Sequence, residues 1–193
     1  MGCFIGNFGY QFDFKCLIES ARLLAGRQPN FKMVLAGSGP LLDDLKALAR
    51  DQSNVIIPGW LSAQEVHALM HLSTFGLLPY KSSPNFLNNI PNKFSEYLAG
   101  NLVLACGLHG EMGRLVDDHN CGFVYKTGDA ANLAQTFDGL LNDSNTLKTM
   151  AENASLLHRD AFDSATIQPK FADYLEDIGN RHNETGGAKI RVK

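Results

Sequence analysis

No pair of cysteines in this sequence has the spacing of a metal or redox motif. The four cysteines, Cys3, Cys16, Cys106 and Cys121, stand singly among apolar residues or glycines. A C-x-x-C zinc or redox pair is therefore excluded, and so is a dense disulfide framework. We expect the four thiols to be reduced and to pack inside the protein.

Long apolar runs and an excess of basic charge are absent as well. No stretch reaches the roughly 18 consecutive apolar residues of a membrane-spanning helix, and the first residues, MGCFIGNFG, lack the charged region of a signal peptide. The formal net charge of −3 at pH 7 provides no general attraction to nucleic acid or anionic lipid. These absences predict a cytoplasmic protein that binds a small ligand and no nucleic acid.

What is present is the composition of one globular domain. The 193 residues include 45% hydrophobic residues, 19% charged residues and 18 glycines, which is enough apolar material for one sizeable core. A chain of this length has no room for a second full domain of the same kind. We expect the domain to span residues 1–178 and the polar stretch 179–193 to be a disordered tail or a cloning remnant.

Short apolar runs alternate with segments of helical periodicity along the domain. This alternation is typical of strand–helix–strand units that share one parallel sheet. It predicts an α/β fold: a Rossmann-like, doubly wound parallel sheet of about six strands flanked by helices. The strands are expected at residues 3–5, 31–36, 55–57, 75–78, 101–105 and 122–125. The helices are expected at residues 14–25, 41–49, 62–70, 91–99, 110–116, 130–141, 144–158 and 167–178, and residues 79–89 are expected to be irregular.

Two glycine turns follow the first two predicted strands. They are Gly6-Asn7-Phe8-Gly9 and Gly37-Ser38-Gly39-Pro40. Ligands of open α/β sheets bind at the carboxyl edge of the strands, and glycine lets backbone N–H groups approach a phosphate closely. Because glycine is common at strand–helix turns in general, a purely structural role remains an equal alternative for each turn.

The segment 88–100 combines a helix start with two charged side chains. If the helix opens at Pro91, Lys93 lies in its first turn and Glu96 follows at the i, i+3 spacing, so the two side chains share a face. A carboxylate can accept hydrogen bonds from a ribose diol, while a lysine and free helix N–H groups can meet phosphate. Spacing alone also fits a solvent-exposed Lys–Glu pair, which is a common feature of helix surfaces.

The same segment resembles the signature of the large family of retaining glycosyltransferases with the GT-B fold, in which an E-x7-E motif precedes an alanine-rich turn. The second glutamate of that motif falls on Glu96. Further similarity follows the order of the family's motifs over residues 4–178. The matching stretches are residues 34–40, 55–60, 101–105, 110–111, 115–116, 121–124, 128–129, 133–134 and 150–154.

The resemblance implies that the chain is the C-terminal, nucleotide-sugar-binding half of such an enzyme. It implies transfer of a hexose-type sugar from a nucleotide diphosphate, with UDP favoured, with retained anomeric configuration and without a divalent metal. The acceptor would be a polysaccharide or glycoconjugate, so that a membrane is involved only indirectly, through a lipid-linked acceptor. The implied partner is the missing N-terminal acceptor-binding domain, without which the chain should be inactive.

The site residues follow from the two turns, the segment 88–100 and the resemblance. Glu96 is expected to hold the ribose, Lys93 and the first glycine turn the diphosphate, and Asn88 or Asn89 the sugar. Trp60 either stacks on the base or packs against the fold. No catalytic residue is assigned in this half. The predicted donor-binding residues are Gly6, Asn7, Gly9, Gly37, Gly39, Asn88, Asn89, Asn92, Lys93 and Glu96.

Three residues depart from the pattern of the family. Asn88 replaces the first glutamate of E-x7-E, and Asn7 and Phe12 stand where the family usually has the arginine and lysine that grip the diphosphate. One explanation is a subgroup with a Pro-Asn-Lys motif, in which Lys93 supplies the cation from the helix start. The other is a non-catalytic binding or interaction module that has lost donor chemistry. A nucleotide-sugar epimerase of the same fold is a further alternative.

Overall fold

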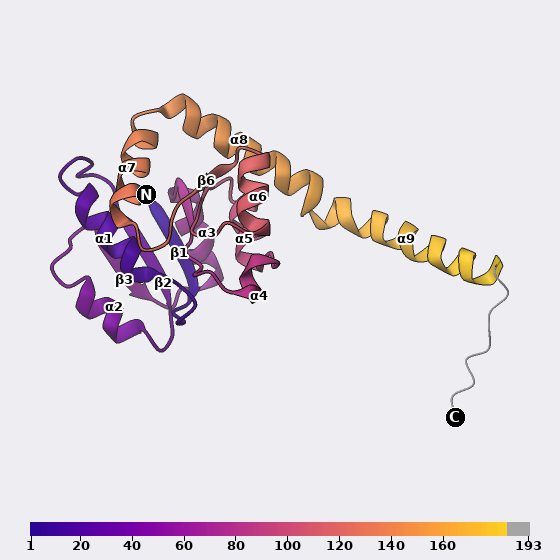
Figure 1. Ribbon diagram of the computed structural model, residues 1–193, viewed down its shortest axis with the longest axis horizontal. Helices are drawn as coiled ribbons and strands as arrows, with labels where there is room; N and C mark the ends of the chain where they lie inside the picture. The colour runs from indigo at the N-terminus through magenta and orange to yellow at the C-terminus, as the bar shows by residue number, and fades with distance from the viewer. Residues whose placement is uncertain (185–193) are drawn as a thin grey trace.

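The computed structural model describes residues 1–184, which form a six-stranded, fully parallel sheet with helices on both faces (Figure 1). The strand order is β3-β2-β1-β4-β5-β6, so the chain winds outward from β1 in one direction and then from β4 in the other. The predicted α/β, doubly wound fold is confirmed. The strands are β1 Gly2–Asn7, β2 Met33–Ser38, β3 Val55–Gly59, β4 Phe75–Leu78, β5 Val103–Cys106 and β6 Gly122–Val124.

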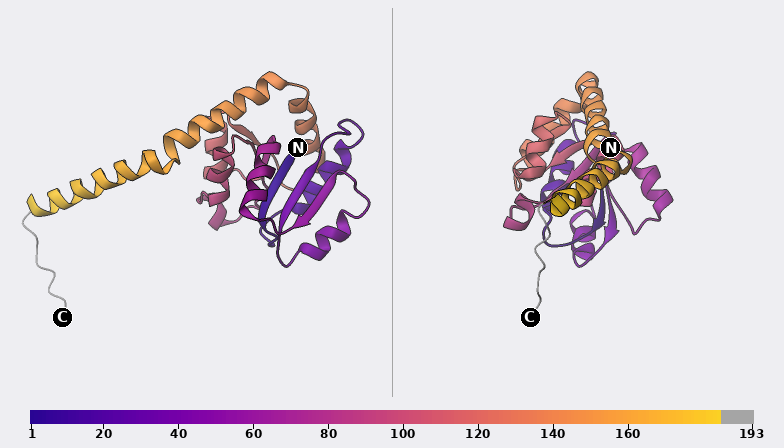
Figure 2. Two further views of the ribbon diagram at one scale, coloured as in Figure 1. Left: turned by 180° about the vertical axis from the view of Figure 1, so that it is seen from behind. Right: turned by 90° about the vertical axis from the view of Figure 1, so that its right-hand side faces the viewer.

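Helices cover the sheet in two layers (Figures 1 and 2). On one side α1 packs against α2 and α7, and on the other α5 packs against α8 and the central strands. All the helices expected from periodicity are present, and one turn of helix, α4, interrupts the loop expected to be irregular. The helices are α1 Phe14–Leu24, α2 Leu42–Leu48, α3 Ala63–Leu72, α4 Pro84–Leu87, α5 Asn92–Ala99, α6 Glu111–Asp118, α7 Ala130–Leu141, α8 Ser144–Ala161 and α9 Ser164–Glu184.

The core lies between the sheet and these layers. Every residue of β4 and β5 is buried, because helices cover both faces of the central strands. The prediction for the cysteines is confirmed: all four are free and buried. Burial raises the pKa of the Cys106 thiol to about 12, which keeps it protonated and unreactive at neutral pH.

Helix α9 leaves the domain and extends away from it (Figures 1 and 2). It continues past residue 178, where we expected the tail to begin, to Glu184. An ion pair between Arg181 and Asp177, spaced i, i+4, supports this last part of the helix. The remainder of the expected tail, residues 185–193, lies outside the described residues. Large apolar side chains of α9 remain exposed: Ile167, Phe171, Tyr174, Leu175 and Ile178.

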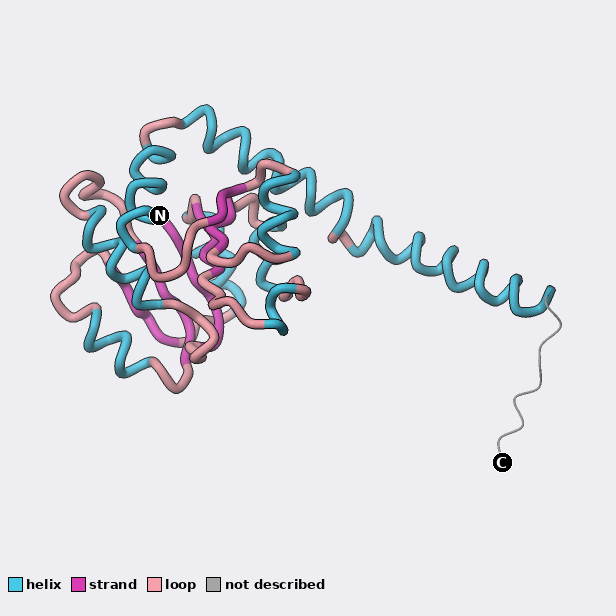
Figure 3. The backbone as a smooth tube through the Cα atoms, in the orientation of Figure 1, coloured by secondary structure: helices cyan, strands magenta, loops and turns pink. Residues whose placement is uncertain are grey.

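Because all six strands are parallel, their carboxyl ends lie together at one edge of the sheet. The loops after the strands gather at that edge (Figure 3). None of the helices within residues 1–184 has the length and apolar character required to cross a bilayer. The cytoplasmic location stays a prediction.

Candidate functional site

The site forms where β1 and β4 separate. β1 pairs with β2 along its whole length, from Gly2 to Asn7. With β4 it pairs only at its beginning, through Gly2 with Phe75 and Cys3 with Gly76. The order of the strands reverses between β1 and β4, and open α/β sheets bind ligands in the crevice at this reversal point.

A cleft of about 390 Å³ occupies this crevice. Its walls are the end of β1, the loop after it, the segment after β4 and the start of α5. A volume of this size is within the range of small-molecule sites. The cleft brings together five of the predicted donor-binding residues. Its lining residues are Ile5, Gly6, Asn7, Gln11, Phe12, Tyr80, Pro91, Asn92, Lys93 and Glu96.

Lys93 is the cationic residue among those that line this cleft. Its ammonium group donates a hydrogen bond to the Ile5 carbonyl oxygen and lies 4.6 Å from the centre of the Phe4 ring. Burial lowers the pKa of Lys93, and the nearby carboxylate of Glu96 partly opposes that shift. The alternative of a fully solvated surface pair is therefore wrong for the lysine. An ammonium has three donors, so two remain for a ligand.

Glu96 lies one turn further along α5 and is exposed to solvent. It faces the same cleft as Lys93 and Gly6. Pro91 precedes the helix and provides no capping side chain. The Phe94 N–H donates to the Pro91 carbonyl oxygen, which leaves the N–H groups of Asn92 and Lys93 at the start of α5 for other acceptors. A carboxylate, an ammonium and a helix start thus converge on one cavity, an arrangement that suits a ligand with both hydroxyl and phosphate groups.

The glycine turns pack against each other beside the cleft. Gly6 has φ of 141° and Gly37 has φ of 143°, conformations that side chains rarely adopt. A Cβ atom on Gly37 would collide with the Gly6 carbonyl oxygen, and one on Gly6 would lie 2.6 Å from the Lys93 ammonium nitrogen. A Cβ atom on Gly39 would lie 2.5 Å from the Asn7 side-chain oxygen and 2.6 Å from the Phe8 backbone nitrogen. The turns are therefore structurally required, whether or not they also bind phosphate.

Trp60 directly follows β3, near the cleft between β1 and α5. Its side chain is 77% exposed, so a core-packing role is excluded. It lines a small hollow of about 60 Å³ together with Gly37, and that hollow shares Ile5 and Gly6 with the main cleft. An exposed indole next to the cleft is placed to stack on a flat ring that enters it.

Several predicted residues lie elsewhere. Asn88 and Asn89 are exposed at the end of α4 and are not among the residues that line the cleft. Gly9 does not line it either, and it lies close to the side chain of Gln11 instead. Because Asn88 and Asn89 lie in a loop without periodicity, their position depends on how α4 packs, which no local pattern reveals.

Phe12 is buried at a position where the resemblance implies a cation that binds the diphosphate. Its ring is buried between Phe4, Phe14 and Tyr80, with ring centres 4.7 to 5.5 Å apart. A charged side chain at this position would have to enter an aromatic cluster. The burial of Phe12 means that a cation in this cleft has to come from another element, and Lys93 of α5 is the cationic residue that lines it.

Sequence reasoning missed the role of α5 in holding β1. Tyr97 is buried, and its hydroxyl oxygen accepts a hydrogen bond from the Ile5 N–H at 2.9 Å. Gln11, a further lining residue, was also missed. A tyrosine within an amphipathic helix is typical of an ordinary core, so the sequence carries no signal for the contact with β1.

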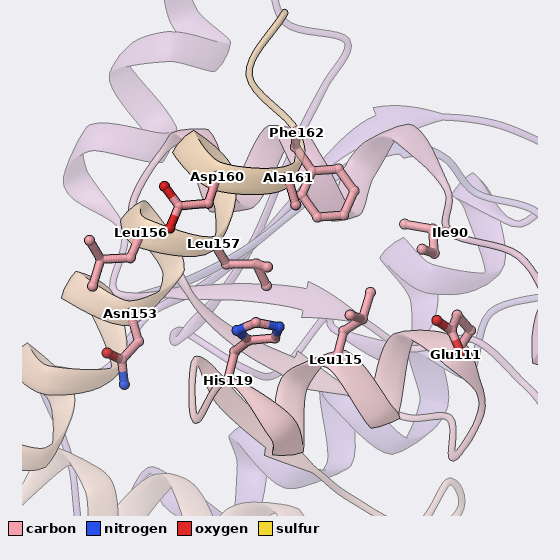
Figure 4. A pocket seen from close by; sticks show the side chains of 10 residues that line it. All are labelled: Ile90, Glu111, Leu115, His119, Asn153, Leu156, Leu157, Asp160, Ala161 and Phe162. Carbon is pink, nitrogen blue, oxygen red and sulfur yellow. The ribbon is translucent and has the colours of Figure 1, made fainter. Parts of the chain in front are cut away.

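A larger groove, of about 580 Å³, lies between α6 and α8 (Figure 4). Glu111, Leu115 and His119 line its α6 side, and its α8 side includes Leu157 and Asp160. Glu111 is already paired with Arg114. None of the described residues that line the groove is a lysine or an arginine, so we do not assign a phosphate-binding site to it.

The histidines of α3 do not complete a metal site within residues 1–184. His67 and His71 lie with ring centres 5.6 Å apart, but no cluster of three or more His, Cys, Asp or Glu side chains suited to a metal occurs in that range.

Known proteins share sequence and fold with this chain. Residues 2–156 match the sequence pattern of the family described as glycosyl transferases group 1. The alpha-D-kanosaminyltransferase of Streptomyces kanamyceticus is 24% identical over 189 residues, which cover 91% of this chain and 45% of that protein. The chain thus spans about half the length of this curated relative.

Solved structures share the fold. The C-terminal domain of the glycosyl transferase group 1 family protein LpcC from Francisella tularensis matches with a TM-score of 0.72 and 17% identity, over 84% of this chain and 85% of that one. Anabaena HepE in complex with UDP-glucose matches with a TM-score of 0.70 and 20% identity, over 90% of this chain and 48% of that one. With the family pattern covering most of its residues, this chain belongs to the glycosyl transferases group 1 family.

Proposed function

We propose that this chain is the C-terminal, donor-binding half of a GT-B glycosyltransferase and that the cleft between β1 and α5 binds a nucleotide diphosphate sugar, with UDP as the favoured nucleotide. The observation that carries the proposal is the convergence of Lys93, Glu96 and the Gly6 turn on one cavity. Family membership supports it, as do the UDP-glucose complex of HepE and the UDP complex of Staphylococcus aureus TarM, which have the same fold.

In this proposal Glu96 accepts hydrogen bonds from the ribose hydroxyls, and the two remaining N–H donors of Lys93 meet the diphosphate. The uncapped first turn of α5 adds backbone donors beside Asn92. As the sugar leaves, negative charge grows on the diphosphate, and donors already fixed by the fold stabilise that charge more than they stabilise the bound substrate. Transfer of a hexose-type sugar with retained configuration and without a divalent metal is part of the same proposal.

The proposal includes a second domain that binds the acceptor, a polysaccharide or glycoconjugate. The chain covers only about half of its full-length relatives, and α9 carries an exposed apolar stripe, Ile167, Phe171, Tyr174, Leu175 and Ile178. These residues recur at helical spacing on one side of α9. Such a stripe fits the apolar surface of a neighbouring domain. This chain alone should bind a donor and transfer nothing.

Replacement of Glu96 tests the proposal directly. Glu96→Ala should weaken UDP binding by about tenfold to a hundredfold, because a hydrogen bond to a charged group contributes roughly 1.5–3 kcal/mol. Glu96→Gln, which keeps one acceptor oxygen, should lose less of the UDP affinity. Titration calorimetry of the 193-residue chain measures both.

Glu152→Ala, on the exposed surface of α8, is the matched control and should leave the dissociation constant unchanged. Equal UDP affinity of the Glu96→Ala variant and the wild type would remove Glu96 from the site.

The alternative, a non-catalytic module, draws on the burial of Phe12 among aromatic rings and on Asn7 in place of a cation. The two functions differ in one property, since a pure interaction module has no need to bind nucleotide diphosphates. A thermal-shift comparison of UDP, GDP and ADP separates them. A donor-binding domain should be stabilised by one nucleotide over the others, whereas no shift with any of the three favours the module.

A further inference from the structure

The backbone of Ile5 is held by helix α5 rather than by a neighbouring strand. The N–H groups of Gly2 and Phe8 donate to Lys32 and Ser38, on the β2 side of β1. Backbone groups alternate sides along a strand, so Ile5 directs its N–H and C=O toward the β4 side. There the N–H donates to the Tyr97 hydroxyl at 2.9 Å, and the carbonyl accepts from Lys93.

The Tyr97 ring occupies the space between the two separating strands. It is buried, and a Cβ atom on Gly76 of β4 would lie 2.5 Å from it. Only glycine at position 76 leaves room for the ring. The last β1–β4 pair is Cys3 with Gly76, so the ladder ends at the residue against which Tyr97 packs.

We propose that Tyr97 is a positioning residue of the cleft: its hydroxyl replaces β4 as the partner of the Ile5 N–H, keeps the ends of β1 and β4 apart, and sets the backbone of Gly6 and Asn7 for the diphosphate. The hydroxyl provides the acceptor for a partly buried backbone donor that no strand partners on this side. The residues it positions, Ile5, Gly6 and Asn7, all line the cleft. The inference about the ligand rests on the function proposed above, whereas the backbone contact stands on its own.

The substitution Tyr97→Phe removes the hydroxyl and keeps the ring. The chain supplies a matched control in Tyr125, which is equally buried but whose hydroxyl has no hydrogen-bond partner among the described residues. Tyr125→Phe therefore removes an identical atom from the core without removing a hydrogen bond.

The first measurement needs no ligand. In amide NMR spectra of the 193-residue chain, Tyr97→Phe should shift the Ile5, Gly6 and Asn7 signals and speed hydrogen exchange at Ile5 about tenfold or more. Tyr125→Phe should leave these three amides in place. Unchanged Ile5, Gly6 and Asn7 signals in Tyr97→Phe would overturn the proposal.

The second measurement is UDP affinity by calorimetry. Tyr97→Phe should bind UDP about tenfold more weakly than wild type because the free loop must be reordered on binding, and Tyr125→Phe should bind like wild type. Shifted amides together with unchanged UDP affinity would refute the role in ligand binding. If wild type itself bound no nucleotide, the proposed function would fail, and the amide spectra would still decide whether Tyr97 positions β1.

Discussion

The ammonium group of Lys93 lies between the Ile5 carbonyl and the Phe4 ring, and its burial lowers its pKa. Because the folded-state pKa is below the ordinary value of a lysine, the group loses its proton at a lower pH than a solvated lysine does. Binding of a diphosphate depends on the charged form, so it should be strongest below that pKa and weaken as pH rises through it.

The pH dependence of UDP binding tests this residue. From about pH 7 to about pH 10, wild-type affinity should fall more steeply than that of Lys93→Arg, because the guanidinium stays charged throughout. Any titration of the nucleotide is common to both proteins and cancels in the ratio of their dissociation constants. Calorimetry at fixed ionic strength measures that ratio. Parallel profiles for the two proteins would show that Lys93 does not meet the phosphates.

At the scale of elements, the close packing of β1 on β2 depends on glycine. Gly37 has φ of 143°, and a Cβ there would run into the backbone of Gly6. Gly139, in α7, has open space where a side chain would begin. The same substitution should therefore act in opposite directions at the two positions, since one glycine is required by its conformation and the other only lowers helix propensity.

Gly37→Ala should destabilise the chain by about 2 kcal/mol, from backbone strain and the collision with Gly6. Gly139→Ala should stabilise it by about 0.8 kcal/mol, the usual gain of alanine over glycine inside a helix. Urea unfolding followed by circular dichroism measures both free energies of unfolding. If Gly37→Ala were as stable as wild type, the close approach of the Gly37 and Gly6 backbones would be contradicted.

In the molecule as a unit, α9 differs from the other helices because its apolar side chains remain exposed. Its apolar side chains are 40% to 60% exposed, from Ile167 at the low end to Tyr174 at the high end, whereas the sheet and its two helix layers enclose a continuous core. The domain should therefore be able to fold without α9, and the stripe should acquire its function only when another domain covers it.

A chain that ends at Asp163 tests this independence. Because α9 touches the domain mainly through α8, its removal should change the free energy of unfolding of the domain by no more than about 1 kcal/mol and should leave UDP affinity unchanged. Calorimetric unfolding and UDP titration measure the two quantities. A loss of cooperative unfolding in the shortened chain would show that α9 belongs to the core.

The order of elements could be predicted from the sequence because it depends on local patterns. The runs 31–36 and 75–78 are apolar at almost every position, which marks strands covered on both faces. The spacing of Lys93 and Glu96 likewise follows from helix geometry alone. The crevice edge could be predicted too, since parallel strands bring their carboxyl ends to one side of the sheet.

Tertiary structure decided which of these residues share the cleft. Lys93 and Tyr97 reach Ile5 across 88 and 92 residues of chain, and the burial of Phe12 depends on rings from other elements. Asn88 and Asn89 carry suitable amides but lie off the cleft, exposed after the end of α4. The periodicity of the sequence thus determined the strands, the helices and the faces of α5. Packing between β1, β4 and α5 determined the shape and charge of the site. The sequence could not show this packing, because contacts between distant segments leave no periodic pattern in it.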